Sequence, residues 1–258
     1  MATPDELDGT EQPFVAHLVE LRDRLVRALI SIGVVFAVLC VYPGSATLYD
    51  LLARPLVMQL PAGSHLIATN PISPFLVPLK VTLLASFLVA LPYVLYQLWA
   101  FIAPGLYSHE KRLVLPLVIS STVLFLCGVA FCYFVVFGRV FHFIQSFAPK
   151  SITAAPDIEA YLGFVLTMFL AFGATFEVPI VVVVLARLGV VSTEKLRSFR
   201  GYFIVIAFIV AAVITPPDIV SQLSLAIPMC LLYEVGLWAA RFVSKPEDKA
   251  EDANVTAS

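Results

Sequence analysis

Six apolar stretches, separated by polar or proline-rich segments, form the pattern of this chain. The stretch over residues 161–186 is apolar throughout except for one carboxylate, Glu177. As a helix its 26 residues reach roughly 39 Å, more than the roughly 30 Å of bilayer hydrocarbon, so the pattern predicts a tilted transmembrane helix. Pro179 removes the hydrogen bond that would end on the Thr175 carbonyl, two residues before Glu177. A kink is therefore predicted beside a carboxylate that lies within the membrane.

Five more apolar stretches predict further spans. They cover residues 28–49, 75–103, 113–138, 201–214 and 219–240. The fifth span has 14 residues and reaches only about 21 Å, so the last two segments fit either a short spanning pair or a re-entrant hairpin. The two prolines before Asp218 predict a turn between them. The predicted fold class is an all-α integral membrane protein with six transmembrane helices, the fifth and sixth being short.

The polar segments predict how the chain is divided. Residues 1–12 are acidic and unpatterned, which predicts a disordered tail, and residues 244–258 predict a second one in the cytoplasm. Residues 13–243 then form a single transmembrane domain. Within it, residues 14–27 have apolar positions at helical spacing and predict an amphipathic lead-in at the membrane surface. Several prolines in residues 50–74 favour a stiff, extended outer loop that packs as a cap, and a second outer loop is predicted near residues 139–160.

Composition and charge placement agree with a polytopic membrane protein. Hydrophobic residues make up 60% of the chain and charged residues 13%. Under the six-span topology, 12 of the 16 Lys and Arg residues fall on one side, and an excess of positive charge marks the cytoplasmic side. Both termini are therefore predicted to be cytoplasmic. The first residues are acidic where a cleaved signal peptide would be basic, so the first apolar stretch is predicted to be retained.

Sequence motifs for catalysis or cofactor binding are not found. The four cysteines belong to no CxxC pair, and His17 and Glu20 are not followed by the second histidine of an HExxH zinc motif. No GxSxG or glycine-rich phosphate loop occurs in the sequence either. An enzyme, a cofactor and a metal centre are therefore not expected. A carboxylate such as Glu177 beside a helix-breaking proline is also typical of an ion-coupled secondary transporter, which stays open as the alternative function.

Four segments carry a more specific signal. They are HLVELRDRL at 17–25, LPYVLYQLWAFIAPGLYSHEKR at 91–112, FGATFEVPI at 172–180 and ITPPDIVSQ at 214–222. In this order, over about residues 13–241, they resemble the TatC family, the polytopic receptor subunit of the twin-arginine protein translocase. The resemblance implies six transmembrane helices, both termini in the cytoplasm and a concave face within the membrane.

The resemblance also implies a location and partners. It implies a receptor in the bacterial cytoplasmic (inner) membrane that binds the twin-arginine signal peptides of folded proteins at its cytoplasmic face. Export would require assembly with single-span TatA- and TatB-like subunits. Self-association in the complex and contact with membrane lipids are expected as well, and binding of nucleic acid is not.

Candidate residues for signal-peptide binding follow from the same resemblance. Glu20 and Glu110 match family positions implicated in recognising two adjacent arginines, and a guanidinium binds a carboxylate through two parallel hydrogen bonds. Arg22 would hold a carboxylate in position and Phe101 would offer apolar surface beside it. From charge alone, Glu20 and Glu110 fit equally well as surface ion pairs with neighbouring basic residues.

Two further sets of residues are predicted to be functional. Glu177, Thr215 and Gln222 would form an intramembrane polar site where partner helices dock, although Glu177 could instead relay protons or simply bond to a neighbouring helix. Pro55 and Asp218 would form a rigid outer cap over the fifth and sixth helices. On turn statistics alone, these two residues would only shape turns.

Overall fold

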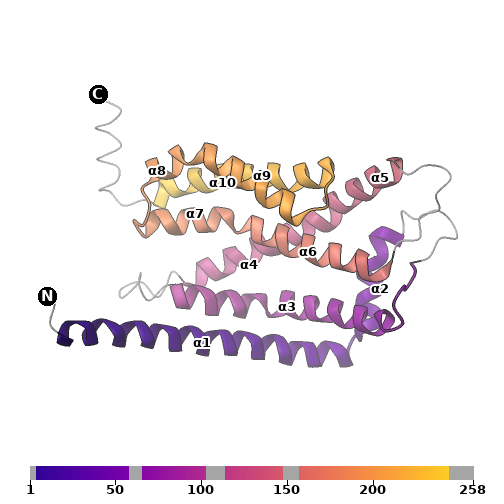
Figure 1. The fold of residues 1–258 in the computed structure, drawn as a ribbon, viewed down its shortest axis with the longest axis horizontal. Helices are drawn as coiled ribbons and strands as arrows, with labels where there is room; N and C mark the ends of the chain where they lie inside the picture. The colour runs from indigo at the N-terminus through magenta and orange to yellow at the C-terminus, as the bar shows by residue number, and fades with distance from the viewer. Residues whose placement is uncertain (1–3, 58–65, 103–113, 148–156, 244–258) are drawn as a thin grey trace. The chain divides into compact units, whose positions relative to one another are not determined.

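A computed structural model of the chain describes residues 4–57, 66–102, 114–147 and 157–243. Within these ranges all regular structure is helical, apart from one isolated bridge between Ile67 and Asp157. The helices (Figure 1) are α1 (Pro4–Val41), α2 (Ser45–Val57), α3 (Ser73–Ile102), α4 (Val114–Phe131), the π-helical segment η3 (Cys132–Val136), α5 (Phe137–Phe147), α6 (Ile158–Phe176), α7 (Val178–Arg187), α8 (Thr193–Ser198), α9 (Arg200–Ile214) and α10 (Ile219–Val243). They group into two compact units, Met1–Ser45 with Thr82–Thr122 and Ala46–Val81 with Val123–Ser258.

Five helical segments of the described chain are long and apolar enough to cross a membrane. They are Ala16–Val41, Ser73–Ile102, Val114–Phe143, Ile158–Arg187 and Ile219–Phe242. A sixth apolar helix, α9, has 15 residues and reaches only about 22 Å. The predicted all-α membrane fold with a short fifth helix is confirmed. The sixth helix is longer than the predicted residues 219–240. Helix α10 continues through Pro228 to Val243 and has 25 residues.

In the first unit, α1 is one continuous helix, which corrects two expectations. Residues 4–12 were predicted to be disordered and are helical, and residues 14–27 continue into the span without a break. A helix can begin at Pro4, because the first helical position needs no N–H donor. Only 6% of the apolar window of α1 is buried, so its side chains can contact lipid or another protein.

The first unit also contains a buried polar contact between α3 and α4. Trp99 on α3 donates a hydrogen bond from Nε1 to Ser121 Oγ on α4 at 3.0 Å, and both side chains are buried. Because a buried indole N–H requires a hydrogen-bond partner, this contact favours one register between the two helices.

The predicted outer loop over residues 50–74 is only partly a loop, because α2 occupies residues 45–57. Its apolar side chains Leu48 and Leu52 pack around Val77 on α3 and Leu162 on α6, in the second unit. An amphipathic face over 13 residues therefore outweighs the disruptive effect of Pro55. Residues 58–65, the remainder of the proline-rich stretch before Leu66, lie outside the described residues.

The third span continues past the predicted start of the second outer loop. From α4 it passes through η3 into α5, which ends at Phe147. In the second unit, aromatic rings on both sides of η3 contact α6: Phe131 lies 5.9 Å from Phe172 and Phe137 lies 5.3 Å from Phe169, between ring centroids. The helical turns before and after η3 therefore both pack against α6.

The stretch over residues 161–186 is broken where a kink was predicted. Helix α6 ends and α7 begins at Glu177, whose backbone N–H donates to the Ala174 carbonyl at 3.1 Å and whose carbonyl accepts from Val181 N at 3.0 Å. Pro179 occupies the first turn of α7, where the absence of an N–H costs little. The regular α-helical hydrogen bonding is therefore interrupted at the carboxylate.

Helices α7 and α10 lie side by side in the second unit (Figure 1). A Cβ atom on Gly236 of α10 would lie 2.9 Å from Pro179 Cα and 3.0 Å from Val182 Cβ, so glycine permits this close approach. Tyr233 extends the same packing, because its hydroxyl donates to the Leu196 carbonyl of α8 at 2.6 Å. The ring of Phe203 on α9 stacks on Tyr233, with the centroids 4.0 Å apart.

Candidate functional site

In the first unit, the predicted signal-peptide site brings together residues 17–24 of α1 and the end of α3. Glu20 Oε1 accepts hydrogen bonds from Arg24 Nε at 2.9 Å and Nη2 at 2.6 Å. The ring of His17 stacks on Phe101 with the centroids 4.3 Å apart, and His17 Nδ1 lies 4.0 Å from Glu20 Oε2. The structure thus brings Glu20 and Phe101 into one cluster, linked by His17, which was not among the predicted site residues.

Arg22 does not contact Glu20. Its guanidinium bonds to the adjacent Asp23, from Nε at 3.0 Å and from Nη2 at 2.8 Å. Arg24 holds the Glu20 carboxylate instead, because residues four apart lie on the same face of a helix whereas residues two apart do not. The other predicted carboxylate, Glu110, lies outside the described residues. The functional roles of Arg22 and Glu110 stay predictions.

In the second unit, the predicted intramembrane polar site is divided between two places. Glu177 is half-buried at the junction of α6 and α7, close to Pro179. Pro179 packs against Gly236, and Gly236 lies 14 residues along α10 from Gln222, a distance of about 21 Å. Glu177 therefore does not share one contact site with Gln222.

Thr215, Asp218 and Gln222 do lie together, at the turn between α9 and α10. The Thr215 hydroxyl is buried and donates to the Ala211 carbonyl of its own helix at 2.8 Å, so it is already used within the chain. Gln222 Nε2 is 3.4 Å from the Phe208 carbonyl, a long hydrogen bond that ties α10 to α9. Of the two predicted partner contacts at this turn, Gln222 has the more available side chain.

Asp218 initiates α10. Its Oδ1 accepts a hydrogen bond from the Ser221 backbone N–H at 2.7 Å, which satisfies one of the free donors at the start of the helix. This is the turn-shaping role that residue statistics indicated. A role as part of an outer cap stays a prediction.

Pro55 lies in the last turn of α2 rather than in an extended loop. Proline has no backbone N–H, so Pro55 leaves the carbonyl of Leu51, four residues earlier, without its usual helical donor. The Tyr133 hydroxyl donates to that carbonyl at 3.2 Å. Pro55 thus creates an acceptor through which α2 is joined to the third span.

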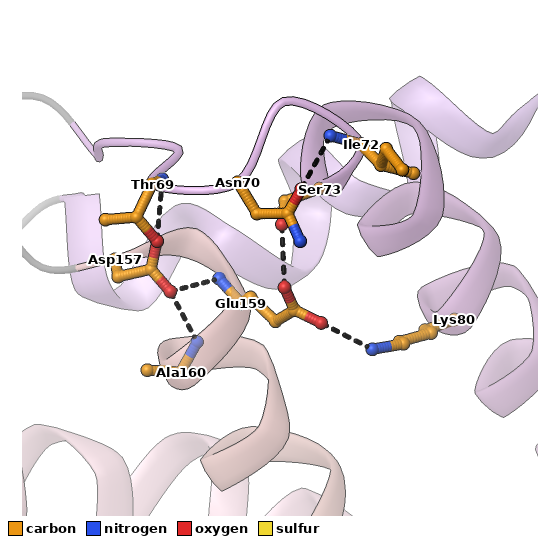
Figure 2. Close-up of polar contacts among 8 residues, drawn as sticks. All are labelled: Thr69, Asn70, Ile72, Ser73, Lys80, Asp157, Glu159 and Ala160. Atoms are coloured by element: carbon orange, nitrogen blue, oxygen red, sulfur yellow. Dashed lines mark hydrogen bonds and ion pairs between the residues drawn. The ribbon is translucent and has the colours of Figure 1, made fainter.

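A polar cluster that the sequence analysis did not identify joins the starts of α3 and α6 (Figure 2). Asp157 Oδ1 accepts from Thr69, from the backbone N–H at 3.1 Å and from Oγ1 at 2.8 Å. Glu159 accepts from Ser73 Oγ at 2.7 Å and from Lys80 Nζ at 3.0 Å. These contacts attach the segment that precedes α3 to the beginning of α6, across nearly 90 positions in the chain.

Asp157 also caps α6. Its Oδ2 accepts from the backbone N–H groups of Glu159 and Ala160 at 3.2 and 3.0 Å. The hydrogen bonds from Ala160 and Thr69 hold the pKa of the Asp157 carboxyl below its usual value. An N-cap could have been predicted here, since Asp157 directly precedes a long apolar run and is followed by an acidic first turn. Its bonds to Thr69 could not, because the two residues are distant in sequence.

Comparison with known proteins gives a consistent match over most of the chain. The family model described as Sec-independent protein translocase protein (TatC) matches residues 16–228. The chain is 52% identical over 232 residues to the Sec-independent protein translocase protein TatC of Halothiobacillus neapolitanus, an alignment that covers 90% of this chain but 63% of that longer protein. Against the TatC protein of Haemophilus influenzae the identity is 48% over 243 residues, with 94% of each chain covered.

The fold also matches solved structures. A crystal structure of the twin arginine translocase receptor TatC superposes with a TM-score of 0.77 and 38% sequence identity, covering 89% of this chain and all of that one. A crystal structure of the same receptor in the detergent DDM gives a TM-score of 0.76. The six-helix arrangement predicted from the apolar pattern is thus shared with proteins of similar sequence.

Proposed function

The chain belongs to the TatC family of Sec-independent protein translocase proteins, a family of non-enzymatic transport components, and we propose that it binds twin-arginine signal peptides through Glu20 and Glu110. The observation that supports this site best is the Glu20 carboxylate, which is 36% exposed and is held by Arg24 through one oxygen only. Carboxylates are suitable ligands for guanidinium groups because both partners are planar and can form paired hydrogen bonds. Glu110 supplies the second carboxylate for the second arginine.

The test is binding of a signal peptide with two adjacent arginines. Glu20→Ala and Glu110→Ala are expected to abolish crosslinking of this peptide to the receptor in membranes while the protein still inserts. Asp23→Ala is a matched control, because Asp23 is an exposed carboxylate on the same helix that pairs with Arg22. Crosslinking that survives in the Glu20→Ala, Glu110→Ala double variant would show that these carboxylates are not the binding site.

A second part of the proposal concerns the partners. The receptor assembles with single-span TatA- and TatB-like subunits, with further copies of itself, and with lipid along its exposed helices. The short α9 and the half-exposed Gln222 support docking near the α9–α10 turn, since a helix of about 22 Å leaves the bilayer locally mismatched. Thr215 contributes by ending α9, and Glu177 offers a separate polar contact about two thirds of the way along its span.

Glu177 can be tested by two substitutions that separate hydrogen bonding from titration. Glu177→Gln keeps a hydrogen-bonding group of similar shape, whereas Glu177→Ala removes it. Glu177→Gln is expected to retain most transport and partner co-purification, and Glu177→Ala to lose much of both. If Gln is as inactive as Ala while partner binding persists, proton relay by Glu177 replaces docking as its role.

The third part concerns location. The chain is an integral membrane protein, and we place it in the bacterial cytoplasmic membrane with residues 13–243 as one transmembrane domain, both termini in the cytoplasm, and Pro55 and Asp218 in a cap on the outer side. Single cysteines at Ile219 and Ser198, both exposed positions, test the orientation. An impermeant thiol reagent applied to intact cells should label the first and not the second. Ser221 is unsuitable as an outer probe, because its side chain is fully buried.

A further inference from the structure

The ring that is exposed beside Glu20 is not Phe101 but His17. Phe101 is only partly exposed, and the imidazole of His17 stacks on its face with an interplanar angle of 16°. The His17 side chain itself is 52% exposed. A flat group that approaches Glu20 along this side therefore meets the free face of the imidazole, while Phe101 supports the imidazole from behind.

Among the described residues, hydrogen-bond donors reach only one oxygen of the Glu20 carboxylate. Both Arg24 nitrogens donate to Oε1, and within the described part of the chain no group donates a hydrogen bond to Oε2. His17 Nδ1 lies 4.0 Å from Oε2, which is beyond hydrogen-bond distance. Arg24 thus acts as a positioning residue that directs Oε2 toward the His17 ring.

We infer that His17 is a specificity-determining residue of the receptor, on whose exposed face an arginine side chain of the signal stacks while it donates to Glu20 Oε2. This inference rests on the signal-peptide site proposed above. A guanidinium is planar and can stack on an aromatic ring while its edge donates hydrogen bonds. A lysine ammonium can form the ion pair but cannot stack in this way. The arrangement therefore favours arginine over lysine. Glu20 without the His17 ring would discriminate less between the two side chains.

The experiment compares His17→Leu with His17→Phe in the full-length chain in membrane vesicles, using fluorescent peptides that carry two adjacent arginines or two adjacent lysines. His17→Leu is expected to weaken binding of the twin-arginine peptide about two- to fivefold, which corresponds to a cation–π contact of about 0.5 to 1 kcal/mol, and to weaken binding of the twin-lysine peptide less. His17→Phe should retain the preference for arginine, because phenylalanine keeps an aromatic face.

Two outcomes would overturn the inference. One is an unchanged ratio of arginine to lysine affinity in His17→Leu, and the other is a ratio in His17→Phe that falls as far as in His17→Leu. The variant Glu20→Gln separates this failure from failure of the proposed site. If Glu20→Gln abolishes peptide binding while His17→Leu has no effect, only the role of His17 is wrong. If Glu20→Gln binds normally, the signal-peptide site and the inference both fail.

Discussion

Gly236→Ala tests the packing of α7 against α10 directly. The added Cβ would lie 2.9 Å from Pro179 Cα and 3.0 Å from Val182 Cβ. Carbon atoms in contact are normally about 3.5 to 4.0 Å apart, so the two helices must separate by roughly 0.5 to 1 Å or bend. The closest atom belongs to the backbone, and it cannot rotate away as a side chain could. Overpacking of this kind costs about 1 to 3 kcal/mol.

Gly163→Ala is the matched control for this prediction. Gly163 is also within a transmembrane helix, α6, but no atom lies within 4 Å of the Cβ that alanine would add. Both variants receive the same gain in helix propensity of about 1 kcal/mol, so the difference between them isolates the packing cost. In detergent, Gly236→Ala is expected to melt about 2 to 12 °C below Gly163→Ala, at about 2 to 4 °C per kcal/mol for a chain of this size. Equal melting temperatures would refute the close contact between α7 and α10.

Three further predictions concern hydrogen bonds and charges. Tyr233→Phe should cost about 1 kcal/mol in thermal unfolding, because it removes a buried hydrogen bond to the end of α8, whereas Tyr202→Phe on exposed α9 surface should cost nothing measurable. Because the pKa of Asp157 is lowered in the folded protein, its hydrogen bonds to Thr69 stabilise the fold fully above the ordinary carboxyl pKa and are lost as pH falls through the folded-state pKa. Amide exchange of residues 66–72, corrected for the intrinsic rate, should therefore be faster at pH 2.5 than at pH 5. An unchanged protection factor would contradict this prediction. Glu159→Lys should destabilise the start of α6 by placing two cations together, and adding Lys80→Glu should restore part of the lost thermal stability; no recovery in the double variant would contradict the ion pair.

The helical spans could be predicted from sequence because each depends on local composition. Long apolar runs without charges identify the spans, and a proline two residues after Glu177 identifies the break between α6 and α7. Helix α2 was missed because Pro55 and its neighbouring prolines suggested an extended loop, while the contacts that favour a helix come from α3 and α6. Those contacts are non-local, and the sequence pattern does not contain them.

The candidate site, like the fold, could be predicted only in part from the sequence. Family resemblance identified Glu20 and Phe101, and helix periodicity could also have selected Arg24 over Arg22 as the partner of Glu20. The stacking of His17 on Phe101 could not be predicted, because it depends on where the end of α3 meets α1. The sequence also did not reveal that the Thr215 hydroxyl donates its hydrogen bond to the Ala211 carbonyl of its own helix.

The π-helical segment η3 has a consequence for changes in chain length. A π turn accommodates one residue more than an α turn, and an α-helix rotates by about 100° per residue. Loss of one residue from α4 itself would turn Phe137 and all later side chains of this span away from α6. Loss of Phe134, which lies in η3 and is 77% exposed, would instead convert the π turn into a regular α turn and leave the faces before and after it in place. The third span therefore has one defined position at which evolution or engineering can shorten the helix without changing which residues face its neighbour.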